Sequence, residues 1–220
     1  MTVVALMLLT FATGLVDAIS VLVLGHVFVA NMTGNVIFLG FWFAQHPVID
    51  LGAAVVSFLS FIAGTVLGGR LARHLDTKVR RWLTIALGIE VLILTTVSIL
   101  AGTGVLAYQG PDRLIIIACL AISFGSQNAA ARQFGIQELS TTVLTQTIVG
   151  IGFDSRLAGG TGHREKLRYG VVLTMLAGAV VGATMTRFAV APVIGLAAVV
   201  VAISAAIFGF APARVPTDHG

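Results

Sequence analysis

Polar side chains suited to holding a small solute or an ion interrupt two otherwise apolar stretches of this sequence. In the first stretch the carboxylate of Asp17 precedes a group of amides and a hydroxyl, and in the second stretch the amide of Asn128 takes the place of the carboxylate and precedes a group of hydroxyls. A carboxylate can bind a cation or carry a proton, whereas amides and hydroxyls orient a polar solute through hydrogen bonds. The candidate substrate- or ion-binding residues are Asp17, Asn31, Thr33, Asn35, Asn128, Thr142 and Thr145.

Asp17 is the strongest of these candidates because it lies deep in an apolar run, about 20 Å along a helix from Val3. A charged carboxylate at such a depth is costly unless it is paired, protonated or hydrated, and it usually marks a functional site. The alternative is packing, since Thr and Asn in membrane helices often only bond a neighbouring helix, for about 0.6 kcal/mol each. Glu90 is a second carboxyl group within an apolar run, which either carries a proton or bonds locally.

Enzymatic chemistry finds no support in the sequence. The five histidines are scattered singly, without the spacing of a metal-binding motif, and the only cysteine is Cys119. The glycines at 159–162 lack the strand and the Lys-Ser/Thr of a phosphate-binding loop. We therefore expect no enzyme, no catalytic residue, no metal and no cofactor. Nucleic-acid binding is not expected either, because the basic residues lie in short connectors rather than in a basic stripe.

The elements that position the polar residues are expected to be membrane helices. Of the 220 residues, 57% are hydrophobic and only 10% are charged, against roughly 25% charged in soluble domains. No period-two alternation indicates a barrel. Eight apolar runs each approach the roughly 20 residues of a spanning helix. They are residues 3–24, 27–44, 51–69, 82–106, 114–131, 136–153, 169–186 and 190–210.

The positive charges distinguish eight crossings from six. All 13 Lys and Arg residues lie in or beside connectors, mainly in the loops 70–81 and 154–168. With eight crossings the bases split 7 to 6 between the two sides, counted along the sequence. If the second and sixth runs enter the membrane and return, the split is 11 to 2, with only Arg113 and Arg187 outside. The positive-inside rule favours this second arrangement, with both termini cytoplasmic. A re-entrant segment is expected to turn near Gly34.

The sequence also predicts an internal repeat. Gly14-Leu-Val-Asp17 matches Gly125-Ser-Gln-Asn128 at a spacing of 111 residues, and Gly64-x-x-x-Gly68 matches Gly178-x-x-x-Gly182 at 114. Such glycine pairs are typical of close helix packing. The predicted fold class is an all-α polytopic membrane helix bundle with six crossings, two re-entrant or broken segments and an inverted 3+3 internal repeat. The predicted units are a first transmembrane repeat (1–107), a second (108–212) and a cytoplasmic tail (213–220).

Two motifs resemble those of a known group of bacterial membrane proteins, the YoaK family. The first is Gly14-Leu-Val-Asp-Ala followed by residues 25–35, GHVFVANMTGN, and the second is Gly125-Ser-Gln-Asn-Ala followed by Thr141, Thr142 and Thr145. The resemblance extends from about Ala5 to Phe210. It implies a multi-pass membrane protein with these polar motifs, and it implies no substrate.

Three functional hypotheses follow. The first is a small secondary transporter that binds an unidentified small polar solute between the halves, with Asp17 binding a cation or carrying the coupling proton. The second is a passive channel, in which the two re-entrant segments form a fixed filter. The third is a non-transporting membrane scaffold.

The expected location is a bacterial-type inner membrane, and the expected partners are the lipid bilayer and a small polar solute or ion. The size allows a homodimer, which no residue requires.

Overall fold

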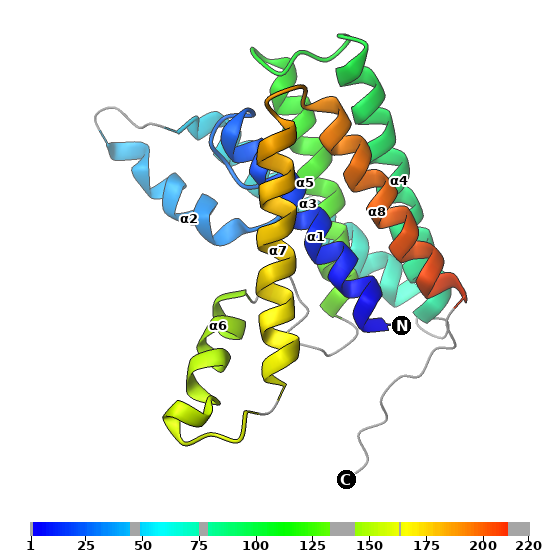
Figure 1. Ribbon diagram of the computed structural model, residues 1–220. Coiled ribbons are helices and arrows are strands. Elements are labelled where there is room, and N and C mark those ends of the chain that lie inside the picture. Colours follow the sequence, from blue (N-terminus) through cyan, green and yellow to red (C-terminus); the bar gives the residue numbers. More distant parts are fainter. Residues whose placement is uncertain (1, 45–48, 75–78, 133–143, 163, 211–220) are drawn as a thin grey trace.

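A computed structural model describes residues 2–44, 49–74, 79–132, 144–162 and 164–210, and within these ranges every regular element is a helix (Figure 1). Six helices are long and apolar enough to cross a membrane, as the sequence predicted. Each of them covers most of one of the apolar runs identified above. They are α1 (Thr2–Leu22), α3 (Leu51–His74), α4 (Val79–Gly102), α5 (Asp112–Arg132), α7 (Glu165–Met185) and α8 (Ala191–Phe210).

The second and sixth apolar runs form much shorter helices. The second forms α2 (Met32–Gly40) and the 3₁₀ turn η1 (Phe41–Phe43), and the sixth contains α6 (Leu144–Phe153), followed by the turn η4 (Arg156–Ala158). At 1.5 Å per residue, the 9 residues of α2 and the 10 of α6 are about 14 and 15 Å long, half the roughly 30 Å of a bilayer core. Neither short helix can cross a membrane by itself.

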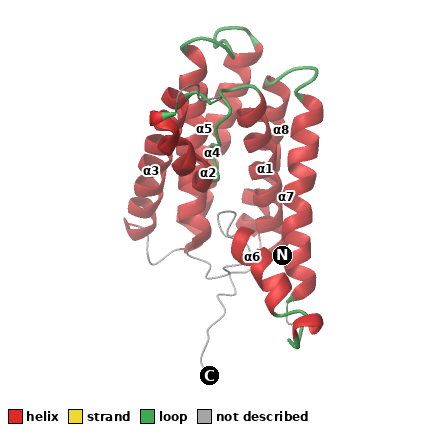
Figure 2. Cartoon of the chain, turned by 90° about the vertical axis from the view of Figure 1, so that its left-hand side faces the viewer, coloured by secondary structure: helices red, strands yellow, loops and turns green. Residues whose placement is uncertain are grey.

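Four of the six long helices form two parallel pairs, α3 with α5 and α1 with α7. In the pair α3–α5, Arg113 at the start of α5 forms an ion pair with Asp50, which directly precedes α3. Further along, Gly68 of α3 lies against the backbone of Ser126. In the pair α1–α7, the starts are matched by a contact between Met7 and Thr174. Figure 2 shows α3 and α5 on one side of the bundle and α1 and α7 on the other.

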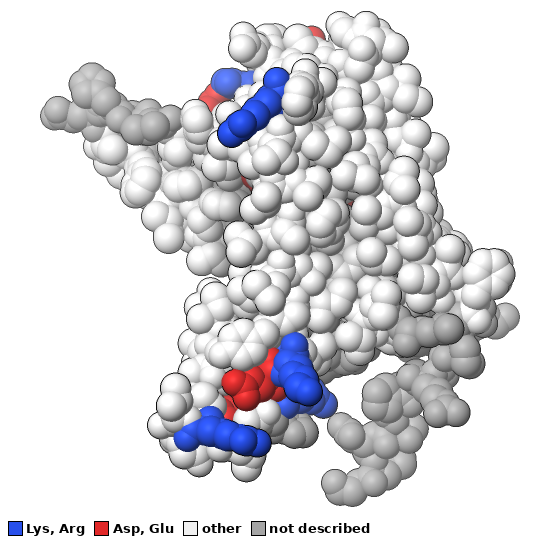
Figure 3. Space-filling view, viewed as in Figure 1, with Lys and Arg blue, Asp and Glu red and all other residues white. Residues whose placement is uncertain are grey.

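The helix directions place the connectors at two ends. The upper end in Figure 1 holds the end of α1, the start of α3, and the α4–α5 and α7–α8 connections, whereas α1 begins and α8 ends at the lower end. The segment between α5 and α7 therefore leaves the lower end and returns to it, because α5 ends and α7 begins there. On the face shown in Figure 3, most of the charged side chains lie at the two ends, separated by a broad belt with little charge.

Both parallel pairs touch through glycine. A Cβ atom added to Gly64 of α3 would lie 2.2 Å from the backbone oxygen of Ile122 in α5. A Cβ atom added to Gly178 of α7 would lie 2.2 Å from the backbone oxygen of Phe11 in α1. Only glycine allows backbones to approach so closely. The expected glycine packing thus joins a helix from the first predicted half to one from the second.

The helices α4 and α8 connect the two pairs. They pack against each other, and the hydroxyl of Ser98 in α4 donates a hydrogen bond to the backbone oxygen of Ala191 in α8 at 2.8 Å. The helix α8 also packs against α1, where Ser204 donates to the backbone oxygen of Ala5 at 2.9 Å. The helix α4 also packs against α5. The core is apolar along these contacts, and the exposed faces of the long helices are apolar as well.

Candidate functional site

Asp17 lies in the last third of α1, with only 5% of its surface exposed. Its Oδ1 accepts hydrogen bonds from the backbone N–H groups of Val29 and Ala30, both at 2.9 Å. Its Oδ2 accepts a hydrogen bond from the side-chain amide of Asn31. Three N–H donors therefore surround the carboxylate, which is an arrangement that stabilises negative charge away from water. The predicted pair of Asp17 and Asn31 is in direct contact.

These bonds hold the chain in a return path after α1. Gly25 has a φ of +124° and His26 a φ of +59°, so two successive residues in the left-handed half of backbone space turn the chain back. The segment then descends along α1 until residues 29–31 meet Asp17. After α2 in the sequence, the backbone N–H of Asp50 donates a hydrogen bond to the backbone oxygen of Gly25 at 3.3 Å. The second apolar run thus leaves the upper end of α1 and returns to the same end, as a re-entrant segment.

Asn35 holds the return path from its inner side. The residue is fully buried, and its Oδ1 accepts a hydrogen bond from the backbone N–H of Phe28 at 2.9 Å. Its Nδ2 donates to the backbone oxygen of Phe28 at 2.6 Å and to the hydroxyl of Ser57 in α3 at 3.2 Å. Ser57 in turn donates to the same oxygen of Phe28. One amide therefore replaces the hydrogen bonds that a helix would have given Phe28, and ties the segment to α3.

The re-entrant segment was expected to turn near Gly34, and it reverses a few residues before it, between Ala30 beside Asp17 and the start of α2. Gly34 belongs to the first turn of α2, and the ring of Phe28 covers it so closely that a Cβ atom would lie 2.5 Å from a ring carbon. The physical reason for this glycine is therefore room for the aromatic ring. Thr33, one residue earlier, is exposed at the start of α2. Among the predicted residues of the first half, it has the most accessible side chain.

In the second half, the structure describes only part of the predicted site. Asn128 is buried in α5, and its amide donates to the backbone oxygen of Phe124 at 2.9 Å. Thr145 is exposed in the first turn of α6, and Thr147, which was not among the predicted site residues, is buried. Thr142 lies outside the described residues. Asn128 and Thr145 thus have the burial of their first-half counterparts, Asp17 and Thr33.

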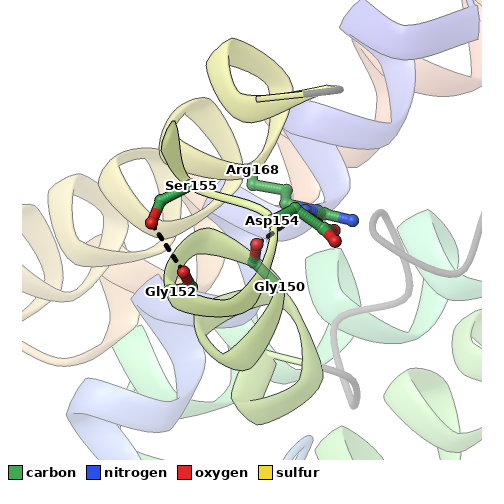
Figure 4. A network of polar contacts seen from close by, with 5 residues as sticks. All are labelled: Gly150, Gly152, Asp154, Ser155 and Arg168. Atoms are coloured by element: carbon green, nitrogen blue, oxygen red, sulfur yellow. Dashed lines mark hydrogen bonds and ion pairs between the residues drawn. The ribbon is translucent and has the colours of Figure 1, made fainter. Parts of the chain in front are cut away.

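A polar network fastens α6 to α7 (Figure 4). Arg168 of α7 donates to the backbone oxygen of Gly150 at 2.7 Å and forms an ion pair with Asp154. Ser155 caps the following turn by accepting a hydrogen bond from the backbone N–H of Ala158 at 3.2 Å, and it donates to the backbone oxygen of Gly152 at 2.7 Å. The end of α6 is thereby held beside the start of α7. The two short helices consequently rest on different long helices, α2 on α3 and α6 on α7.

Sequence reasoning did not identify several buried polar groups. Ser57 holds Phe28, and no motif pointed to it. Ser123 and Gln127 of α5 are buried, and the hydroxyl of the first and the amide oxygen of the second have no hydrogen-bond partner among the described residues. Gln127 could have been identified, since it directly precedes Asn128 in the repeated motif. Within the described part of the chain, no three His, Cys, Asp or Glu residues lie together as metal ligands would.

Comparison with known proteins agrees with the membrane assignment. A family model described as "Protein of unknown function (DUF1275)" matches residues 5–207. The UPF0700 transmembrane protein YoaK of Bacillus subtilis (strain 168) is 33% identical to the chain over 151 residues. The matched part is 66% of this chain and 64% of that relative, so it spans slightly less than two thirds of the relative's length. No solved structure matches the chain.

Proposed function

We propose that this chain, which belongs to the DUF1275 family, is a small secondary transporter for a small polar solute. The expected resemblance to the YoaK family is borne out by the similarity to the transmembrane protein YoaK. The observation that carries the proposal is the re-entrant segment held beside Asp17 within the bundle. Irregular backbone at membrane depth is tolerated only where it is buried in protein or lines a watery cavity. A bundle that only anchored other proteins would gain nothing from such a break.

We also infer that the two predicted halves form an inverted repeat, as in many secondary transporters. The support comes from the glycine contacts. At the repeat spacing of 111 residues, the counterpart of Phe11 is Ile122. At the spacing of 114 residues, the counterpart of Gly64 is Gly178. The contact of Gly178 with Phe11 therefore corresponds to the contact of Gly64 with Ile122, and both have the same 2.2 Å approach. Each half crosses the membrane an odd number of times. The second half therefore begins on the opposite side and runs in the opposite direction to the first.

The solute-binding residues divide into two groups in this proposal. Asp17, Asn31 and Asn35 hold the re-entrant segment in place, because their polar atoms bond its backbone or one another. Thr33 and Thr145 stand at the first turns of the two short helices with exposed side chains, where unsatisfied helix N–H groups also lie. In Figure 1, α2 and α6 point away from the middle of the bundle towards opposite ends. A solute between their N-termini would meet both threonines, with Asn128 as a further contact. Thr142, outside the described residues, stays a predicted contact.

The orientation in the membrane follows from charge. We place the lower end, with both termini, in the cytoplasm of a bacterial-type inner membrane, because 11 of the 13 bases belong to that side. The alternative function is a passive channel, which the paired re-entrant segments also favour. A homodimer remains a prediction.

The proposal can be tested on the purified protein. A library of small polar solutes is first screened for compounds that raise thermal stability, since a ligand that binds only the folded state stabilises it. Uptake of each such compound is then measured in proteoliposomes. A transporter gives saturable uptake that accumulates solute when an ion gradient is imposed. Non-saturable flux down the gradient alone would indicate the channel, and neither binding nor flux would indicate the scaffold.

A pair of matched variants locates the solute. Thr33→Val should raise the half-saturation concentration without changing the melting temperature, because the side chain is exposed and Val keeps its shape. Thr184→Val is the control, since this exposed hydroxyl of α7 bonds only backbone oxygens of its own helix. Equal uptake by both variants would exclude Thr33 from the binding site.

A further inference from the structure

Glu90 is a buried carboxyl group without a partner. It lies near the middle of α4 with 2% of its surface exposed. Neither Oε1 nor Oε2 has a hydrogen-bond partner among the described residues. Asp17, the other carboxyl group at membrane depth, accepts three hydrogen bonds. Hydrogen-bond donors therefore stabilise a negative charge on Asp17, whereas the described residues provide no donor to Glu90.

The position of Glu90 is one of tight helix packing. Six buried residues of α4 recur at alternating intervals of four and three, which places them on one face of the helix, and Trp82 and Ala86 beside this face are buried as well. Glu90 is the polar member of an otherwise apolar series. The series is Leu83, Leu87, Glu90, Leu94, Val97 and Ala101.

The helix α5, which packs against α4, carries unpartnered polar atoms at the same height as Glu90. Glu90 lies twelve residues before the end of α4, and Phe124 lies twelve residues after the start of α5. Both are therefore about 18 Å from the connected ends of the two helices. Ser123 and Gln127 flank this level, on the face of α5 opposite to Gly125, which touches α3. Their hydroxyl and amide oxygen are buried and unpartnered in the described part of the protein.

Among the described residues of the helices that pack against α4, no charged group near this level compensates a negative charge on Glu90. The described helix α8 contains no titratable residue. In α5 the charged residues stand in the first and last turns, and only Cys119 titrates between them. In α3 the titratable residues begin at Arg70, near the lower end. An ionised carboxylate without donors in such surroundings is far more costly than a neutral carboxylic acid.

We propose that Glu90 is a proton-binding site of this protein, neutral in the conformation described and ionised when the contact between α4 and α5 opens to water. On opening, the O–H bond of the carboxylic acid breaks, the proton passes to water and the electron pair stays on the carboxylate. Closing requires the reverse step. The use of this proton to drive solute uptake rests on the proposed transporter function, whereas the proton site itself does not.

The site can be tested by infrared spectroscopy of the whole protein in lipid. A protonated carboxylic acid gives a C=O stretching band that a carboxylate lacks, and at neutral pH the wild type should show this band. The chain contains only three glutamates, Glu90, Glu138 and Glu165. Glu90→Gln should remove the band, while the control variant with Glu138→Gln and Glu165→Gln should keep it. Absence of the band, or its persistence in Glu90→Gln, would overturn the proposal.

Two further measurements keep the outcome decisive. If Glu90→Gln fails to fold, ¹³C-labelled glutamate in the wild type should shift the band, whereas ¹³C-labelled aspartate should not; the opposite result would overturn the proposal.

Coupling is tested with the solute identified above, for which Glu90→Gln should keep solute exchange but lose accumulation driven by a proton gradient. Accumulation in Glu90→Gln equal to wild type would refute coupling through Glu90. No uptake by the wild type would instead refute the transporter, leaving the infrared result to decide the proton site.

Discussion

Replacing Gly64 by alanine should force apart two helices that touch through their backbones. The new Cβ atom would lie 2.2 Å from the backbone oxygen of Ile122. That oxygen cannot turn away, because it belongs to the helix α5. Ordinary contacts of a Cβ atom begin at 3.4 Å, so the helices α3 and α5 must separate locally by about 1 Å. Overpacking of this kind costs about 1–3 kcal/mol.

A glycine of α4 supplies the control for Gly64. A Cβ atom at Gly88 would meet nothing within 4 Å, so Gly88→Ala adds only helix propensity and should stabilise by about 0.5–1 kcal/mol. The two alanine variants should therefore differ by about 1.5–4 kcal/mol in the free energy of unfolding. Gly178→Ala repeats the test in the pair α1–α7, which shares no partner with the first, so the two costs should add within about 0.5 kcal/mol.

The assay is unfolding of the purified variants in one detergent, with melting temperature and denaturant midpoint measured for each. Gly64→Ala should melt well below wild type, and Gly88→Ala at or above it. The reasoning would be refuted if Gly64→Ala and Gly88→Ala melted together, since the close approach of α3 and α5 would then not exist in the folded protein.

Three other predictions use different parts of the structure. In a Cys119→Ala background, an impermeant thiol reagent should label Gln109→Cys in intact cells but not Thr161→Cys, and labelling of both would place the two loops on one side. Asn35→Ala should destabilise by about 1–3 kcal/mol for each backbone group of the return path left unpaired, which thermal unfolding measures; a wild-type melting temperature would exclude this role. Asp17→Ala should lower the melting temperature far more than Asp17→Asn, because the amide oxygen of Asn can still accept both backbone N–H bonds. Equal decreases in melting temperature would show that the negative charge itself holds the segment.

The crossing helices could be predicted from the sequence because the physical signal is local. Twenty apolar residues without charge need a bilayer wherever they occur, and all six such helices are present. The return of the second run could be predicted from charge counting alone, because a short apolar segment that crossed would have placed the two basic loops on opposite sides. Neither inference required knowledge of a contact between distant residues.

The role of Asp17 could not be predicted, because its partners are backbone groups. The N–H groups of Val29 and Ala30 carry no signature in the sequence, and they reach the carboxylate only because Gly25 and His26 turn the chain back. The sequence therefore indicated that the carboxylate matters without indicating whether it binds a solute or the chain itself. Ser57 was missed for the same reason, since its partner is the backbone oxygen of Phe28.

Asp17 and Glu90 together suggest how such a small bundle could link a proton to movement. A carboxylate met by three N–H donors can stay charged and hold the chain in place, so Asp17 suits a fixed element. A carboxyl group met by none must be neutral or must gain water, so Glu90 suits an element that moves. The helix α4 carries Glu90 and packs against both α5 and α8. It therefore lies between the pair α3–α5 and the pair α1–α7, to which α8 is attached. Charging Glu90 would weaken the contact that joins the two pairs, while the glycine contacts within each pair would stay closed.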